Sequence, residues 1–372
     1  MTRLAVAFVV QGEGRGHMTQ ALALGRFLRA AGHEIVRVFV GTSPFRSVPS
    51  YFREAIGAPL ETYDAPTQVP DRAARGVSVA RTAVDALTRL PAFVRGGWRI
   101  HRATDRVDVV VNFLDLVGGL SRVVFRSRVP AVAIAHNYVF LHPALSGAPG
   151  APFARRAVMA YARATASRAA TKVALSYGPL ATAAPDLVVA PPLLRPELGD
   201  SSPSDEGHLL AYALNAGYGD LLAEWHRRQT SVTVHCYVDG GAGALRSAPA
   251  PGFHAHGLSA DGFLRHLATC RAYVGSAGFE SVCEAFYLGK PALVVATAGQ
   301  LEQALNAWDA GRVGAALPGS YEDLDSFWAR PPVPSGDAIR EFRRWVSMAP
   351  EILVGAVERA ASSRRRTGRG NA

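Results

Sequence analysis

The sequence predicts an α/β protein of two domains, each built around a sheet of parallel strands. Its 372 residues exceed what one hydrophobic core usually serves, and 49% of them are hydrophobic, enough for a sizeable core. Residues 4–40 and 272–296 each run from an apolar segment through a glycine turn and a helical pattern into a second apolar segment. That order is typical of strand–helix–strand units, and the polar run 201–207 separates the two halves.

The first half begins with the apolar run 4–10, which predicts a fully buried strand. A glycine-rich turn follows, and apolar residues at helical spacing predict a helix from Met18 to Ala31, which Gly32 ends. Pro91 and the pair Gly96-Gly97 are expected to kink or split a long basic helix. The other elements predicted here are strands at 34–40, 61–66, 107–113, 130–140, 171–177 and 187–198, and helices at 74–106 and 154–170.

The second half repeats the alternation. Residues 279–288 have helical spacing, Gly289 is the expected end of that helix, and Pro291 cannot continue it. The other elements predicted here are strands at 208–214, 232–238, 272–274 and 292–296, and helices at 261–270 and 337–361.

Charge and cysteine content exclude several classes of protein. The formal net charge is +10, and Arg364, Arg365, Arg366 and Arg369 supply part of it in a tail that we expect to be disordered. A basic protein suits nucleic acid, an anionic membrane or an anionic substrate, but no helix-turn-helix, zinc-finger or RRM-type signature supports nucleic acid. The three cysteines lack metal-binding spacing and indicate reduced thiols. With no signal-peptide pattern and no apolar run near the ~20 residues of a membrane span, we expect a cytoplasmic protein.

Histidines concentrate in one region of the second half, at His254, His256 and His266. Metal sites need ligands at compatible spacing. The spacing here crosses a turn and no carboxylate joins the three histidines, so we expect no metal site.

The stretch 273–315 most strongly indicates function. A strand end, a turn closed by Gly278 and a helix start follow one another, so backbone N–H groups and the positive helix end point to one place, where phosphate commonly binds. Ser276 and Ser281 can add hydroxyl donors. Glu284 is placed to accept two hydrogen bonds from a ribose diol.

Polar residues also follow the next predicted strand. Gln300, Glu302 and Gln303 stand at its carboxyl end, where ligands bind in open α/β sheets. The alternative is a surface helix–strand unit without a ligand, but the convergence of so many polar groups favours a binding site.

The run from Ser276 to Glu284, SAGFESVCE, resembles the signature of nucleotide-sugar glycosyltransferases with the two-domain GT-B fold. Gly289-Lys-Pro and Glu302-Gln303-x-x-Asn306-Ala307 share this resemblance, which extends over nearly the whole chain. The similar families are the bacterial transferases that add GlcNAc to a lipid-linked muropeptide and the plant and antibiotic UDP-glycosyltransferases. The resemblance implies two Rossmann-like domains facing across a cleft. The expected parts are 1–197 for the acceptor, 205–336 for the donor, a helix near 337–361 that crosses back to the first domain, and a basic tail, 362–372.

The resemblance also implies roles on the donor side. In these families the residues matching Gly278, Ser281 and the first-turn amides, including that of Phe279, hold the diphosphate. Glu284 matches the ribose ligand, and Glu302 and Gln303 match ligands of the sugar hydroxyls.

Three more donor contacts are implied by position. Arg195 matches a hinge arginine that reaches the diphosphate, or is a linker charge. Asn215 begins a turn used against the donor phosphates, and the Leu258 backbone matches the segment that contacts the nucleobase. Ser276 departs from a phosphate-touching histidine and Glu280 from an asparagine, so Glu280 is expected to face the acceptor or the sugar.

The turn G-x-G-x-G-H, residues 12–17, is expected on the acceptor side. Alone it could be a dinucleotide turn, but the third glycine comes too early and no acidic residue follows the second strand, which disfavours an oxidoreductase. The resemblance places Glu13, Gly14, Gly16 and His17 beside the acceptor. Histidine can take a hydroxyl proton near neutral pH, with Glu13 as a second possible base and a structural His17 as the alternative.

Two further residues belong to the expected acceptor half. In plant relatives an aspartate near the position of Asp115 orients the catalytic histidine, although Asp115 could instead cap a helix. His136 ends a predicted strand at a position where the lipid-linked family has His-Glu, and Asn137 departs from that pair.

The sequence therefore predicts an inverting, metal-independent glycosyltransferase that moves a sugar from a nucleoside diphosphate, UDP being favoured, to an acceptor hydroxyl without a further cofactor. Basic and aromatic residues around Trp98 suit an anionic membrane surface and a lipid-linked acceptor at the inner face of the plasma membrane. An ordinary helix with a solvated arginine face is the alternative. A nucleotide-sugar 2-epimerase of the same fold and a non-catalytic nucleotide-sugar binding protein remain open.

Overall fold

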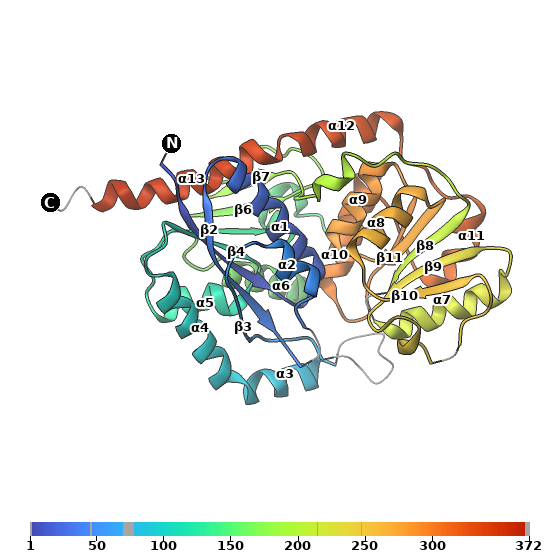
Figure 1. Ribbon diagram of the computed structural model, residues 1–372, viewed down its shortest axis with the longest axis horizontal. Coiled ribbons are helices and arrows are strands. Elements are labelled where there is room, and N and C mark those ends of the chain that lie inside the picture. Colours follow the sequence, from blue (N-terminus) through green and yellow to red (C-terminus); the bar gives the residue numbers. More distant parts are fainter. Residues whose placement is uncertain (1, 45–46, 70–77, 214, 247, 369–372) are drawn as a thin grey trace.

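The computed structural model describes residues 2–44, 47–69, 78–213, 215–246 and 248–368. Two α/β domains lie side by side, and a pair of C-terminal helices runs along both (Figure 1). The start of the helix predicted from Ala74 and the tail residue Arg369 lie outside the described residues.

The first sheet has seven parallel strands in the order β3-β2-β1-β4-β5-β6-β7. Helices cover both faces, which is why its central strands are continuous apolar runs buried on both sides. The strands are β1 (Ala5–Gln11), β2 (Glu34–Thr42), β3 (Leu60–Asp64), β4 (Val109–Phe113), β5 (Ala131–Ala135), β6 (Thr171–Leu175) and β7 (Leu187–Ala190). The helices are α1 (Arg15–Ala30), α2 (Ser50–Ala55), α3 (Val79–Thr88), α4 (Leu90–Thr104), α5 (Leu116–Val124) and α6 (Pro152–Thr165), with 3₁₀ turns at His136–Leu141, Pro143–Leu145 and Pro196–Leu198.

The second sheet has six parallel strands in the order β10-β9-β8-β11-β12-β13. The strands are β8 (His208–Ala213), β9 (Thr233–Val238), β10 (Phe253–His256), β11 (Ala272–Ser276), β12 (Ala292–Val295) and β13 (Leu317–Gly319). The helices are α7 (Ala216–Arg228), α8 (Ala260–Thr269), α9 (Phe279–Leu288), α10 (Leu301–Arg312) and α11 (Leu324–Ala329), with 3₁₀ turns at Gly241–Ala244 and Tyr321–Asp323. The predicted α/β class with two parallel sheets is confirmed.

Both sheets reverse their strand order beside their first strand, between β1 and β4 and between β8 and β11. Ligands of open α/β sheets bind beyond the carboxyl ends of the strands at such a reversal. After β1 the chain turns so tightly that a Cβ on Gly12 would stand 2.0 Å from the Gly41 carbonyl oxygen, which only glycine allows.

The C-terminal helices, α12 (Gly336–Ser347) and α13 (Ala349–Gly368), tie the domains together. Phe342 of α12 packs on Phe286 of α9 with ring centroids 4.7 Å apart, and Trp345 Nε1 donates to the Ser176 carbonyl of the first domain at 2.9 Å. The predicted crossing back to the first domain is therefore present. Helix α13 runs on to Gly368, into the segment predicted as a basic tail.

The glycine pair of α4 does not break the helix as we expected. The break falls at Arg89, with Pro91 in the first turn of α4, where its missing N–H costs nothing. Instead the pair lets α4 pack closely: a Cβ on Gly96 would stand 3.1 Å from the Tyr63 ring, and one on Gly97 would stand 3.1 Å from Ser121 Cβ. Within the described chain, every helix is too short or too polar to cross a bilayer.

The contact between α5 and α6 predicts a stability effect at Gly119. A Cβ there would lie 2.5 Å from the carbonyl oxygens of Ala164 and Thr165, and backbone cannot move aside cheaply. We expect Gly119→Ala to lower the free energy of unfolding by about 1–3 kcal/mol in urea denaturation. Gly147→Ala, whose Cβ meets no described atom within 4 Å, is the control and should change it by less than about 0.5 kcal/mol. Equal effects of the two substitutions would contradict this packing.

Candidate active site

A cleft of about 800 Å³ lies between the two domains, beyond the strand ends at which both sheets reverse. The turn after β1 and the start of α1 line one side, and the starts of α9 and α10 line the other. Every predicted site residue except Asp115 borders it. These residues are Glu13, Gly14, Gly16, His17, His136, Arg195, Asn215, Leu258, Ser276, Gly278, Phe279, Glu280, Ser281, Glu284, Gln300, Glu302 and Gln303.

The start of α9 has the geometry of an anion site. Gly278 is its N-cap and has an extended conformation. Among the described residues no side chain caps the helix, so its first N–H groups, which border the cleft, have no side-chain acceptor. Ser281 Oγ accepts from Tyr273 Oη at 3.0 Å, which leaves its own proton free to be donated.

Arg195 and Glu284 form a buried, two-pronged ion pair in the cleft. Arg195 Nε donates to Glu284 Oε1 at 2.6 Å and Nη2 donates to Oε2 at 3.2 Å, while Nη1 donates to the Ala260 carbonyl at 3.0 Å. Burial raises the pKa of Glu284, and the Arg195 guanidinium opposes that shift. The predicted ribose ligand and the predicted diphosphate ligand are thus each other's partners in this structure.

A chain of hydrogen bonds links His17 to the other domain. His17 Nδ1 lies 3.2 Å from Gln20 Oε1, and Gln20 Nε2 donates to Glu280 Oε1 at 2.7 Å. Because a carboxamide oxygen only accepts, Nδ1 of His17 carries the proton and Nε2 is left as the basic nitrogen. Burial lowers the pKa of His17 to about 4, so its ring is neutral at neutral pH.

Glu280 is the second unusual group of this chain. Burial raises its pKa to about 8, with the hydrogen bond from Gln20 opposing the shift. Its Oε2 atom is buried and has no hydrogen-bond partner among the described residues. At neutral pH Glu280 is therefore mostly a neutral carboxyl group at the border of the cleft.

The expected pairing of Asp115 with His17 is wrong in this structure. Asp115 caps α5 instead: its Oδ1 accepts from the Gly118 N–H at 2.6 Å. Burial raises its pKa to about 6. Gln20 is one residue that sequence reasoning missed, although its position one helical turn after His17 is a signal that could have found it.

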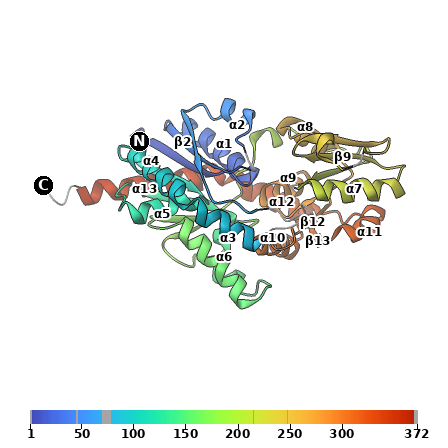
Figure 2. The ribbon, with the colours of Figure 1, turned by 90° about the horizontal axis from the view of Figure 1, so that it is seen from below.

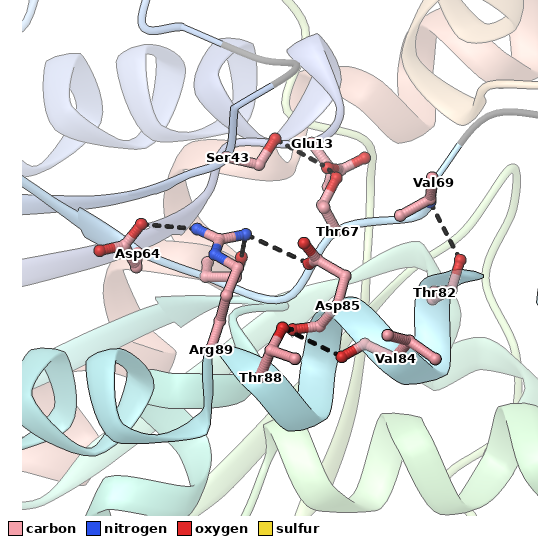
Figure 3. A network of polar contacts seen from close by, with 11 residues as sticks. Glu13, Ser43, Asp64, Thr67, Val69, Thr82, Val84, Asp85, Thr88 and Arg89 are labelled. Atoms are coloured by element: carbon pink, nitrogen blue, oxygen red, sulfur yellow. Dashed lines mark hydrogen bonds and ion pairs between the residues drawn. The ribbon is translucent and has the colours of Figure 1, made fainter. Parts of the chain in front are cut away.

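Glu13 is held on the first-domain side of the cleft by the loop after β3. Thr67 Oγ1 donates to Glu13, and Ser43 Oγ donates to its Oε1 at 3.4 Å (Figure 3). Thr82 Oγ1 of α3 accepts from the Val69 N–H at 3.0 Å, so α3 fixes this loop from behind. Glu13 is therefore engaged within its own domain.

Arg89 anchors the joint between α3 and α4. It lies between two carboxylates, with Nη2 at 2.5 Å from Asp64 Oδ1 and Nη1 at 3.3 Å from Asp85 Oδ2 (Figure 3). The orientation of α3, and so of the loop that lines the cleft, follows from this clamp.

The three polar residues before and in α10 have separate surroundings. Gln300 Nε2 donates to Gln68 Oε1 at 2.6 Å across the domains, and Gln303 Oε1 accepts from the Thr297 N–H at 2.9 Å. Burial raises the pKa of Glu302, and the Asn137 side chain opposes the shift. Asn137, a departure from the family pattern, thus faces a predicted sugar ligand.

His136 lies deep in the seam between the domains. Its ring stacks on Phe279 at a centroid distance of 3.9 Å and an angle of 7°, and its Nδ1 bonds the Leu175 carbonyl at 2.8 Å. Burial lowers its pKa. The ring therefore packs α9 onto the first domain as well as lining the cleft.

One wall of the cleft is apolar and was not predicted. Ala154, Ala157, Val158 and Tyr161 of α6 line it, and Tyr161 Oη accepts from Gln11 Nε2 at 3.0 Å. Phe153 stands at the start of this helix with 83% of its surface exposed. The helical spacing of these residues is a sequence signal that could have indicated this wall, although the same helix also carries Arg155, Arg156 and Arg163.

The histidines of the second domain do converge, contrary to our expectation. His256 and His266 meet His235, a residue that sequence reasoning left out, with one nitrogen of each ring within 4.8 Å of the others. This group lies outside the lining of the cleft.

Comparison with known proteins supports the fold and the family. The sequence model of the family described as glycosyl transferase family 1 matches residues 106–329. No curated protein sequence matches the chain.

Three crystal structures illustrate the structural likeness. The calicheamicin glycosyltransferase CalG4 aligns with a TM-score of 0.58 at 20% identity over 97% of this chain and 99% of its own. SnogD, a glycosyltransferase from Streptomyces nogalater, aligns with a TM-score of 0.56 at 19% identity over 97% of this chain and 100% of its own. MurG from Acinetobacter baumannii aligns with a TM-score of 0.54 at 16% identity over 96% of this chain and 100% of its own. At these identities the likeness shows a shared fold, which is the GT-B fold.

Glu280→Gln tests the proton on the buried carboxyl. Because the pKa of Glu280 rises from an ordinary 4.5 to about 8, the folded chain keeps a proton that the unfolded chain releases above its own pKa. The carboxyl therefore lowers stability progressively as the pH rises from about 5 to about 8. The amide cannot ionise, so the free energy of unfolding of the variant should gain on the wild type over that interval.

Urea denaturation at about pH 5.5 and about pH 8.5 measures this difference. Glu341→Gln, on an exposed carboxylate of α12, is the matched control and should show no such trend. A difference between wild type and Glu280→Gln that stays constant with pH would rule out a protonated Glu280.

Proposed function

The chain belongs to glycosyl transferase family 1, and from that premise we propose that it transfers a sugar from a nucleoside diphosphate, UDP in the first instance, to an acceptor hydroxyl with inversion at the anomeric carbon. The observation that carries this proposal is the chain His17–Gln20–Glu280, which holds a neutral imidazole beside the anion-binding start of α9. A base and a leaving-group site facing each other across one cleft suit a displacement reaction.

The donor would bind on the second domain. The N–H groups at the start of α9 and the Ser281 hydroxyl would donate hydrogen bonds to its diphosphate. The ribose diol would bind Glu284, and the Arg195 guanidinium, already in the cleft, would share its donors between Glu284 and a phosphate oxygen. The ion pair thus holds both ligands in place before the donor arrives.

The acceptor hydroxyl would lose its proton to Nε2 of His17. The acceptor oxygen forms a bond to the anomeric carbon from the face opposite the phosphate, the bond from that carbon to the phosphate oxygen breaks, and its electron pair stays on the diphosphate. Negative charge grows on the leaving group, where the α9 amides and Arg195 stabilise it. The bound diphosphate also raises the low pKa of His17, which strengthens it as a base.

Gln20 and Glu280 act as positioning residues for this step. The Gln20 side chain can accept from His17 Nδ1 only in the orientation that donates its Nε2 to Glu280. Glu280 therefore selects the tautomer of His17 across the domain boundary. Glu280 also lines the cleft, and its carboxyl group would bind a hydroxyl of the sugar or the acceptor.

The acceptor is proposed to be hydrophobic and presented at a membrane. Helices α3, α4, α5 and α6 of the first domain lie next to one another (Figure 2), and each carries exposed apolar side chains. We name this set of exposed apolar residues the apolar ridge; its members are Val84, Leu87, Leu90, Val94, Trp98, Leu120, Val123, Val124 and Phe153. Arg102 lies over the Trp98 ring at 5.6 Å, as expected of a surface for anionic lipid at the inner face of the plasma membrane.

We predict that two substitutions in the cleft separate chemistry from donor binding. His17→Ala should lower kcat/KM for transfer from a UDP-hexose by about 10²- to 10⁴-fold, because the base is lost, while UDP still raises the melting temperature. Glu284→Gln should weaken UDP binding by about tenfold or more, because a charged hydrogen-bond acceptor is lost. Thermal shift with UDP, TDP, GDP and NAD, followed by product analysis of transfer, measures both.

The control is His101→Ala, a partly buried histidine of α4 outside the cleft, which should leave both readouts unchanged. A wild-type protein that binds UDP but transfers no sugar in any assay would favour a non-catalytic binding protein. Release of free sugar or of an epimer without any acceptor would favour a 2-epimerase. A His17→Ala variant with the kcat/KM of the wild type would contradict the proposal that His17 is the base.

The apolar ridge gives a separate prediction. Leu87→Ser with Trp98→Ser should reduce sedimentation with phosphatidylglycerol vesicles by about tenfold or more, because two exposed apolar side chains no longer enter the bilayer surface. Leu317→Ser, on an exposed leucine of the second domain, should sediment like the wild type. Equal sedimentation of the ridge variant and the wild type would remove the membrane from the proposal.

A further inference from the structure

Four aromatic side chains of β9 and β10 project from one face of the second sheet. Strand residues two apart share a face, and the register pairs His235 with His254 and Tyr237 with His256. Helix α8 covers this face and adds His266. Cys236, on the opposite face of β9, is buried in the apolar core. The histidines thus gather through strand register and helix packing, not through sequence spacing.

The rings are close enough to share one ion. His235 Nδ1 lies 2.9 Å from His256 Nε2, and the rings of His235 and His266 stack at 3.9 Å between centroids. One nitrogen from each of the three rings lies within 4.8 Å of the others, a separation that ligands about 2.0–2.1 Å from a common metal reach with small side-chain rotations. All three side chains are only partly buried, so an ion has access from solvent.

One of the three rings also has a partner outside the group. Tyr237 Oη lies 2.8 Å from His266 Nδ1 and fixes the orientation of that ring, as outer partners of ligating histidines do.

We propose that His235, His256 and His266 bind one divalent transition-metal ion, with Zn²⁺ as the probe. Three imidazole ligands with water in the remaining position suit Zn²⁺, Ni²⁺ or Cu²⁺ and exclude Mg²⁺ and Ca²⁺, which prefer oxygen. This site is separate from the proposed sugar transfer, which uses residues of the cleft, and does not depend on it.

The position of the three histidines gives the ion a structural effect on the donor half. It would join β9, β10 and α8, and α8 begins with Ser259 and Ala260 at the cleft. The Ala260 carbonyl accepts from Arg195, and Tyr237, which bonds His266, also lines the cleft. Zinc would therefore stabilise the fold of the second domain and restrain the end of α8 that borders the donor site.

The test uses the full chain without a histidine tag. Titration with Zn²⁺ against a chromogenic chelator should show one ion bound per chain, and Co²⁺ should give a visible absorption band from coordinated nitrogen. His256→Gln and His266→Gln should each weaken Zn²⁺ binding by more than about tenfold, and the rise in melting temperature with Zn²⁺ should disappear with it. His101→Gln, remote on α4, should bind like the wild type.

Three results would overturn the site. These are no saturable binding of Zn²⁺ to the wild type, no Co²⁺ band, or His256→Gln and His266→Gln proteins that bind as the wild type does. The first two need no variant, so the test holds even if a substitution prevents folding. Donor binding by the metal-free wild type would be expected either way and keeps this result distinct from failure of the proposed function.

Discussion

The close approach of α1 and α9 is the constraint on which the rest of the structure depends. A Cβ on Gly16 would stand 3.0 Å from Glu280 Cγ, so the two helix starts meet with no room for a larger residue. One turn further along α1, Gln20 donates to Glu280 across the same junction. Two helix N-termini, each at the strand-order reversal of its sheet, therefore face one cleft. Because of this contact, the proposed base on one domain and the proposed anion site on the other face the same cleft.

Burying polar groups at that junction has an energetic cost that shapes their chemistry. Glu280 and Glu284 are both buried, but the cost of burying a carboxylate is offset differently in each. Glu284 is paired with Arg195 by two hydrogen bonds, so its charge is matched. Glu280 receives only a carboxamide, and its raised pKa means that it avoids the cost by keeping its proton. Neighbouring carboxyls on one helix thus perform different tasks: one offers charge to a cation or a diol, and the other offers a hydroxyl.

Sequence reasoning found most of the buried strands and the helix that begins at Phe279 because those signals are local. Buried strands, glycine turns and the helix from Phe279 to Leu288 are encoded by spacing within a few residues. Gln20 is local to His17, but the contact that orients it, with Glu280, depends on which group the other domain brings to α1, while Asp115 caps the start of α5. The histidine group was missed for the same reason. His235 and His256 are distant in sequence and meet only through the register of β9 with β10.

The two halves of the cleft differ in how much a sequence can say about them, and the difference follows from what each must bind. A nucleoside diphosphate has one chemistry, so a helix end, a carboxylate and a guanidinium recur as a recognisable motif. The acceptor side is built from the loop holding Glu13 and from small apolar residues of α6, groups that recur in every kind of protein. Such a wall selects by shape and apolar area and can change without disturbing the fold. If the proposed acceptor binds there, its identity depends on the shape of that wall, between Thr67 and Tyr161, and not on any motif.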